Sequence, residues 1–154
     1  MDTAKERERS VFDQRLARSI ERARRYPGFY YAVVSVDLGL RPAADEPEAA
    51  DREALLAAAT HRLEACLRVT ELPPTLRHGD LIAHVHEHEL VVLLDGLKEM
   101  SHAVIAAERI LAELSLPFSR AEGEVRLMPS VGVAVSATGH DTLAASDDFF
   151  SYRR

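Results

Sequence analysis

Hydrophobic and polar residues alternate along this chain with two different periods. Near the N-terminus, apolar residues recur every three or four positions among Arg and Glu, which predicts an amphipathic helix that ends near 26–28. The apolar positions of this helix are Val11, Phe12, Leu16, Ile20 and Ala23. The next segment, 29–38, is apolar, β-branched and aromatic, which predicts a buried central strand ending at Asp37.

A second helix and a hairpin follow. A loop rich in Pro, Ala and acidic residues, 41–50, precedes the helix, for which Asp51 is the predicted N-cap. The apolar positions of the helix are Leu55, Leu56, Ala59, Leu63, Cys66 and Leu67. Segments 81–85 and 89–94 are two strand-like runs separated by a very short polar segment, which predicts an antiparallel hairpin.

The rest of the chain again alternates between predicted helices and predicted strands. Ser101 opens a third helix, which Pro117 stops. A small hairpin is expected within 118–128, then a strand at 130–135 and a final helix from about Asp141. Helices that alternate with hairpin-joined strands predict the α/β (α+β) class, with one mixed sheet covered by helices.

The composition fits a single domain that spans residues 1–154. With 47% hydrophobic and 29% charged residues, the chain can bury a substantial core. The formal net charge of -6 argues against a broad nucleic-acid interface. No apolar run is long enough to span a bilayer and the charged N-terminus lacks a signal peptide, so we expect a cytoplasmic protein with no membrane partner. The lone Cys66 agrees with a reducing compartment and is interpreted as a core residue.

Short strings in this order resemble the GGDEF domains of diguanylate cyclases. The similar segments are Arg9-x-x-Phe12, Val36-Asp37-Leu38, the AAERI string at 106–110, the LPF string at 116–118 and the SVGVA string at 130–134. Each string alone is a weak motif, but the shared order and spacing run nearly end to end. The resemblance implies a ferredoxin-like βαββαβ core.

The predicted hairpin departs from the family where the family carries Gly-Gly-Asp/Glu-Glu-Phe. The five positions are His86, Glu87, His88, Glu89 and Leu90. By resemblance, the divalent metal of the cyclase reaction would be held by Asp37 and the third motif position, His88. A neutral imidazole is a poor ligand for Mg²⁺, because hard cations prefer carboxylate and water oxygens. We therefore expect no metal cofactor and no catalytic residue.

Other departures agree with a loss of catalysis. The two glycines of the motif, which let a backbone without Cβ approach the nucleotide, are replaced by His86 and Glu87. In the loop after Asp37, the Asn with which the family contacts guanine is absent. Asp51 could correspond to a later guanine-binding aspartate, although its predicted N-cap role explains it without a ligand.

The product-binding motif of the family is better preserved. The segment 77–84, RHGDLIAH, follows the R-x-x-D-x-x-A-R spacing that precedes the GGDEF motif. By resemblance, Arg77 and Asp80 would bind cyclic di-GMP together with Arg109 of the AAERI string. Guanine O6 and N7 suit an arginine fork, and its N1 and N2 donors suit a carboxylate. Alternatively, Arg77 and Asp80 form a local ion pair, and Arg109 is an exposed helix residue.

Three histidines of the hairpin suggest a different site. His84, His86 and His88 alternate with other residues, so in a regular strand they would share one face, as a zinc site requires. The turn between the two strands would disturb this alignment. Solvent-exposed residues at a hairpin tip are the alternative, and no distant fourth ligand is evident.

Three functions follow from these residues. The first is an inactive GGDEF domain that acts as a cyclic di-GMP receptor and signals to a protein partner. The second is a ligand-independent scaffold or dimerisation domain, with a homodimer as its simplest form. The third is residual cyclase activity. The sequence leaves open whether the chain is free-standing or a fragment of a longer protein.

Overall fold

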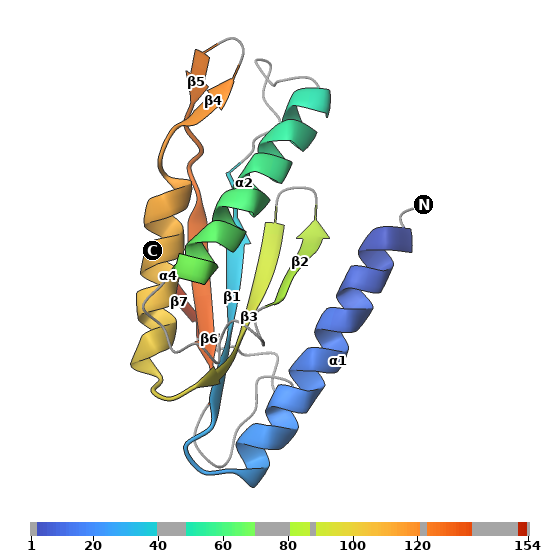
Figure 1. Cartoon of the computed structure of the whole chain (residues 1–154), viewed down its shortest axis with the longest axis vertical. Coiled ribbons are helices and arrows are strands. Elements are labelled where there is room, and N and C mark those ends of the chain that lie inside the picture. The colour runs from blue at the N-terminus through green and yellow to red at the C-terminus, as the bar shows by residue number, and fades with distance from the viewer. Residues whose placement is uncertain are drawn as a thin grey trace.

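Three helices and a five-stranded antiparallel sheet make up the described part of this computed structural model, which comprises residues 3–39, 49–69, 81–86, 89–120, 123–136 and 151–153 (Figure 1). The helices are α1 (Thr3–Arg25), α2 (Ala49–Val69) and α4 (Ser101–Leu114). The sheet strands are β1 (Tyr30–Asp37), β2 (Leu81–His86), β3 (Glu89–Leu97), β6 (Ser130–Val135) and β7 (Ser151–Arg153). Strands β4 (Phe118–Arg120) and β5 (Gly123–Val125) form a separate hairpin.

The strand order β2-β3-β1-β6-β7 places β1 at the centre, as the sequence predicts. The α+β class and the ferredoxin-like core are confirmed. The expectation of a mixed sheet is wrong, because every pairing in the described sheet is antiparallel. The reason is topological: β3 returns from the hairpin and lies between β1 and β2, so the parallel strands joined by α2 are not neighbours.

The sheet carries a hydrophobic cluster on each face, because successive residues of a strand point to opposite sides. On one face, α2 and α4 cover the larger cluster, which includes Val34, Val36, Leu63, Leu94 and Ile110. On the other face, α1 contributes Phe12 and Ile20 to a smaller cluster with Tyr31, Ala83, Leu93 and Ala134. Helix α1 lies alongside β2 and also contacts β1 and β3 (Figure 1).

Most element boundaries agree with the periodicity, with two corrections. Helix α2 begins at Ala49, so Asp51 is its third residue and not its N-cap. Strand β7 was not predicted, because its three residues carry no alternating pattern. The predicted final helix lies outside the described residues, apart from this strand. Within the described part of the chain, no helix is long and apolar enough to cross a membrane.

Candidate functional site

Two carboxylates meet where β1 ends. Asp37 is the last residue of β1, and its cross-strand partners are Glu89 on β3 and Ser130 on β6. Directly opposed residues of antiparallel strands project from the same face, with their Cβ atoms about 4.5–5.5 Å apart. Asp37 and Glu89 are both half-buried. The structure thus brings together two of the positions selected from the sequence, at the end of the sheet where the family resemblance locates catalysis.

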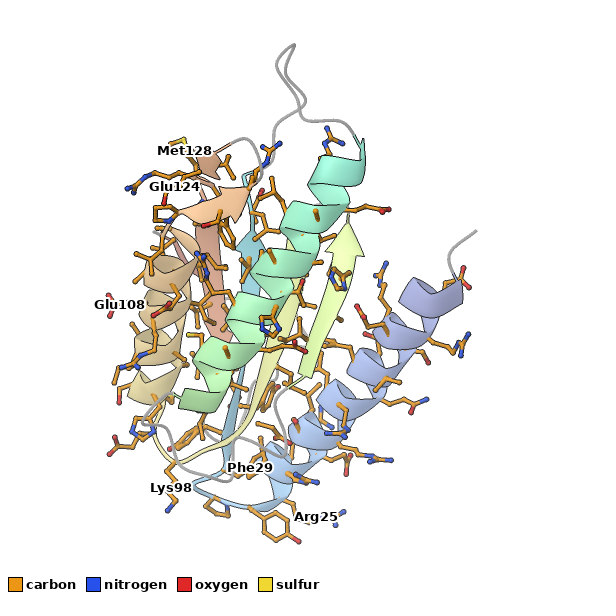
Figure 2. All side chains as sticks on the ribbon, turned by 45° about the horizontal axis from the view of Figure 1, so that its top comes forward. Arg25, Phe29, Lys98, Glu108, Glu124 and Met128 are labelled. Carbon is orange, nitrogen blue, oxygen red and sulfur yellow. The ribbon has the colours of Figure 1, made fainter. Side chains whose placement is uncertain are left out.

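The Asp37 carboxylate is already engaged by its own loop. Its Oδ1 atom accepts a hydrogen bond of 2.8 Å from the backbone N–H of Gly39. Gly39 has φ +73°, and a Cβ built on it would lie 2.3 Å from the carbonyl oxygen of Met128. Figure 2 shows Met128 at this end of the molecule and Phe29 at the opposite end. A tight contact between two backbone segments therefore sets the position of Asp37.

The remaining motif positions divide into described and undescribed residues. Leu90 is fully buried in the core, where a hydrophobic residue is needed whether or not the domain is active. His86 ends β2, and its backbone pairs with Glu89. Glu87 and His88 lie outside the described residues. The expected loss of a metal ligand at His88 thus stays a prediction.

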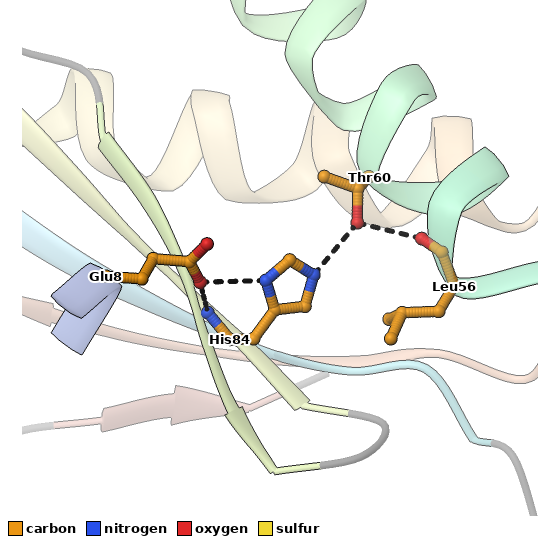
Figure 3. A network of polar contacts seen from close by, with 4 residues as sticks. All are labelled: Glu8, Leu56, Thr60 and His84. Atoms are coloured by element: carbon orange, nitrogen blue, oxygen red, sulfur yellow. Dashed lines mark hydrogen bonds and ion pairs between the residues drawn. The ribbon is translucent and has the colours of Figure 1, made fainter. Parts of the chain in front are cut away.

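The hairpin histidines do not follow a regular strand. The β2–β3 register shifts between His84 and His86, which breaks the alternation that a shared face would need. The ring of His84 is engaged elsewhere: Nδ1 lies 2.8 Å from Glu8 Oε1, and Nε2 lies 3.4 Å from Thr60 Oγ1 (Figure 3). Among residues with described positions, no group of three or more His, Cys, Asp or Glu side chains could hold a metal ion.

Arg109 is the described member of the predicted cyclic di-GMP site, since Arg77 and Asp80 lie outside the described residues. It is half-buried on α4, not fully exposed. Its charge acts on the thiol of Cys66, a residue near the C-terminal end of α2. Cys66 lies on α2, which packs against α4, so the charge of Arg109 acts across the contact between these two helices.

The thiol of Cys66 is buried between α2 and α4, which confirms its interpretation as a core residue. Its pKa is raised from 9.0 to about 11, mainly by burial and also by the charge of Glu113, while the charge of Arg109 lowers it. The folded state therefore retains the thiol proton over a pH range in which the unfolded chain loses it.

A stability change at alkaline pH is expected from this shift. Because the folded pKa of Cys66 is the higher one, its contribution to the free energy of unfolding is complete below pH 9 and is lost as the pH rises toward about 11. Urea unfolding of the protein and of Cys66→Ala at several pH values measures this contribution as the difference between the two. An equal loss of stability in both proteins would contradict it.

The sequence did not indicate the contacts of Glu8. Glu8 lies four residues before Phe12, so it belongs to the stripe of α1 that faces the sheet. An acidic residue on that stripe requires a polar partner, which the structure supplies as His84. The position of Glu8 in the helical period could have indicated that it has a polar partner, but not that this partner is His84.

Comparisons with known proteins agree with this geometry. The family model of the diguanylate cyclase GGDEF domain matches residues 53–148. A search of the curated proteins finds no match. Among solved structures, the GGDEF domain of YfiN (TpbB) from Pseudomonas aeruginosa is 26% identical, with a TM-score of 0.73 over 89% of this chain and 80% of that chain.

Two other solved structures share the fold at lower identity. The active GGEEF domain of a diguanylate cyclase from Vibrio cholerae is 16% identical, with a TM-score of 0.65 over 89% of this chain and 80% of that chain. The GGDEF domain of DgcB from Caulobacter crescentus, in complex with cyclic di-GMP, is 17% identical, with a TM-score of 0.61 over 89% of this chain and 76% of that chain.

Proposed function

Because the chain belongs to the GGDEF family, we propose that it binds cyclic di-GMP without synthesising it and communicates the bound state to a protein partner. The proposal has two parts. One concerns the end of the sheet that carries Asp37, and the other concerns the segment that leads from α2 into β2.

The loss of synthesis is supported by the residues around Asp37. The active relative from Vibrio cholerae has a GGEEF motif, with an acid at the third position, whereas this chain has His88 there. In metal-assisted attack on a phosphate, a divalent ion held by oxygen ligands neutralises the negative charge that develops on the phosphate. The imidazole of His88 supplies neither an oxygen ligand nor a negative charge to hold that ion. One oxygen of Asp37 accepts the Gly39 N–H bond, which fixes the orientation of this carboxylate. With His88 at the third motif position, the site keeps Asp37 and Glu89 but loses the carboxylate that the resemblance pairs with Asp37.

The position of Arg109 is the main observation in favour of ligand binding. Arg109 is half-buried on α4, its charge acts on the Cys66 thiol of α2, and the sequence continues from α2 through Arg77 and Asp80 into β2. An arginine from α4 and an R-x-x-D segment after α2 can therefore converge on one ligand. Arginine forks pair with guanine and phosphate, and a carboxylate accepts from the guanine N1 and N2 donors. The complex of DgcB with cyclic di-GMP provides a precedent in a related fold.

Calorimetric titration with cyclic di-GMP tests the proposal. We expect a dissociation constant of about 1 μM for the unchanged protein, equivalent to about 8 kcal/mol. Arg77→Ala and Arg109→Ala should each weaken binding about tenfold to a hundredfold, because a bidentate arginine contact to a base contributes about 1–3 kcal/mol. Arg126→Ala is the matched control, since Arg126 is an exposed arginine that belongs to neither proposed ligand segment.

Two outcomes would overturn the proposal. If no heat is released by the unchanged protein at saturating ligand concentrations, the receptor function is wrong, and a stable, nucleotide-independent complex would favour the scaffold function. If incubation with GTP and Mg²⁺ or Mn²⁺ yields cyclic di-GMP, the assignment of His88 as an inactivating residue is wrong.

A further inference from the structure

One flank of α1 carries a row of arginines. At about 3.6 residues per turn, five arginines of this helix fall within about 80° of its circumference. This basic stripe consists of Arg7, Arg15, Arg18, Arg22 and Arg25. Within the helix as described, Thr3–Arg25, no acidic residue falls in that arc. Arg15 is half-buried and the other four arginines are exposed, and α1 is the outermost element on its side of the sheet (Figure 1).

Two exposed apolar side chains lie beside these arginines. Val11, which is 44% exposed, falls within the same arc of the helix. Tyr26, which is 55% exposed, follows the helix, and its N–H donates a 2.8 Å bond to the carbonyl of Arg22. Tyr26 therefore continues the last turn and lies next to Arg22. Because tyrosine and arginine are enriched among the residues that dominate binding energy at protein–protein interfaces, this surface has the composition of a protein-binding site.

Arg22 of the basic stripe is already oriented by the fold. Its Nη1 atom lies 3.3 Å from Oδ2 of Asp95 on β3, and the other oxygen of Asp95 accepts a 2.8 Å bond from the buried hydroxyl of Ser19. The guanidinium also lies 5.8 Å from the ring centre of Phe29. The side chain of Arg22 nevertheless keeps 51% of its surface exposed. A carboxylate of a partner can therefore bind an arginine whose position is set in advance, which lowers the entropic cost of binding.

The charge of the basic stripe is opposite to that of the whole chain, which has a formal net charge of -6. A nucleic acid or an anionic bilayer extends beyond one helix, so it would also meet the acidic remainder of the protein. A single acidic helix can contact the basic stripe alone. Carboxylates spaced three and four residues apart on such a helix would oppose arginines that have the same spacing. A symmetric dimer through the basic stripe would oppose like charges and is disfavoured.

We propose that the basic stripe is the docking surface for an acidic helix of a protein partner. This helix presents carboxylates to the arginines and an apolar residue to each of Val11 and Tyr26. Arginine forks bind carboxylates bidentately, which fixes the register of the two helices, and the apolar contacts remove Val11 and Tyr26 from water. The inference rests on the proposed function in one respect, that the domain has a protein partner. The contact itself uses no residue of the proposed cyclic di-GMP site.

Fluorescence anisotropy of a labelled helical peptide, titrated with the full chain, tests this docking surface. The peptide is about 18 residues long to match the basic stripe at about 1.5 Å per residue, with glutamates three and four residues apart on one face and a leucine near each end. We expect a dissociation constant of about 10 μM at low ionic strength. Arg18→Glu should weaken binding about tenfold and reduce its salt dependence, because an attraction becomes a repulsion.

Two further variants separate the basic stripe from general electrostatics. Arg24→Glu is the matched control for Arg18→Glu, since Arg24 is an exposed arginine of the same helix outside the arc, and it should change the affinity little. Tyr26→Ala should weaken binding about tenfold without altering the salt dependence, because it removes an apolar contact and no charge.

Three results would overturn the inference: no binding of the peptide at about 1 mM protein, an equal loss of affinity in Arg24→Glu and Arg18→Glu, or tighter binding to duplex DNA or phosphatidylglycerol vesicles than to the peptide. Calorimetric titration of the same preparations with cyclic di-GMP keeps the two proposals apart. If the peptide binds but cyclic di-GMP does not, only the receptor function fails; in the opposite case, only the docking surface fails. Circular dichroism verifies that each variant is folded, and Tyr26→Ala, beyond the helix, tests the surface even if Arg18→Glu does not fold.

Discussion

Gly39→Ala is expected to lower the free energy of unfolding by about 3–5 kcal/mol, whereas Gly28→Ala should lower it by about 1–2 kcal/mol. Both glycines have positive φ values, +73° at Gly39 and +86° at Gly28, and an L-residue pays for that conformation at either position. The difference between them is steric. At Gly39 the added Cβ would lie 2.3 Å from the carbonyl oxygen of Met128, whereas at Gly28 nothing lies within 4 Å.

The clash at Gly39 cannot be relieved by a rotamer change, because the obstructing atoms belong to the backbone of Met128. Either the Met128 segment or the turn that holds Asp37 must move, and the second movement would break the Gly39 N–H bond to the carboxylate. Urea unfolding of the two variants beside the unchanged protein gives both values. Both variants place an alanine at a positive φ, so the difference between their free energies of unfolding measures the steric clash at Gly39. Losses that agree within about 0.5 kcal/mol would show that this contact is not tight.

The elements of the fold could be predicted because burial produces local periods. Segment 29–38 is apolar on both sides, and the strand β1 it predicts has neighbours on both edges and helices against both faces. The two runs around the hairpin pair in the expected antiparallel sense. Resemblance then identified the core topology, which the comparisons confirm.

The predictions from the sequence are wrong at features that hydrophobic periodicity does not encode. The parallel or antiparallel sense of neighbouring strands depends on which strand lies between β1 and β2, and no residue pattern records that order. Strand β7 is too short to show alternation. Asp51 has a typical N-cap side chain, but residues Ala49 and Ala50 before it have high helical propensity and are helical.

The candidate site was predicted in part. Asp37 and Glu89 were selected by resemblance to a motif, and the strand register brings them to neighbouring positions. Arg109 was selected in the same way and is half-buried on α4, where its charge acts on Cys66 of α2. The contacts of His84 were not predicted, because its partners come from α1 and α2, far from it in the sequence. Side-chain pairs between distant elements depend on the packing of whole helices.

Arg62 is the second residue whose replacement should have a large effect. Its guanidinium lies over the ring of Phe118, 3.6 Å from the ring centre. It also donates to the carbonyl groups of Glu113 at 3.1 Å, Leu116 at 2.8 Å and Pro117 at 2.9 Å. Glu113 is in the last turn of α4 and Leu116 and Pro117 follow the helix, so the guanidinium lies at the C-terminal end of α4, where the helix dipole favours a cation. One side chain of α2 therefore caps α4 and holds the start of β4.

Arg62→Ala should lower the free energy of unfolding by about 3 kcal/mol, since hydrogen bonds from a charged group contribute about 1.5–3 kcal/mol and the cation–π contact adds about 1 kcal/mol. Arg62→Lys should recover only part of this loss, because an ammonium group lacks the planar fork that reaches several carbonyls at once. Arg126→Ala, at an exposed position, should cost no more than about 0.5 kcal/mol.

The Arg62 variants also connect stability to the proposed ligand site. Arg109 and Arg62 lie at the contact between α2 and α4, so loss of the Arg62 cap loosens the helix that carries Arg109. Under conditions where Arg62→Ala remains folded, its affinity for cyclic di-GMP should therefore fall, although Arg62 itself is not proposed to contact the ligand. Urea unfolding and calorimetric titration of the same preparations measure both quantities. A stability loss as small as that of Arg126→Ala would show that water replaces the guanidinium at these carbonyls without cost.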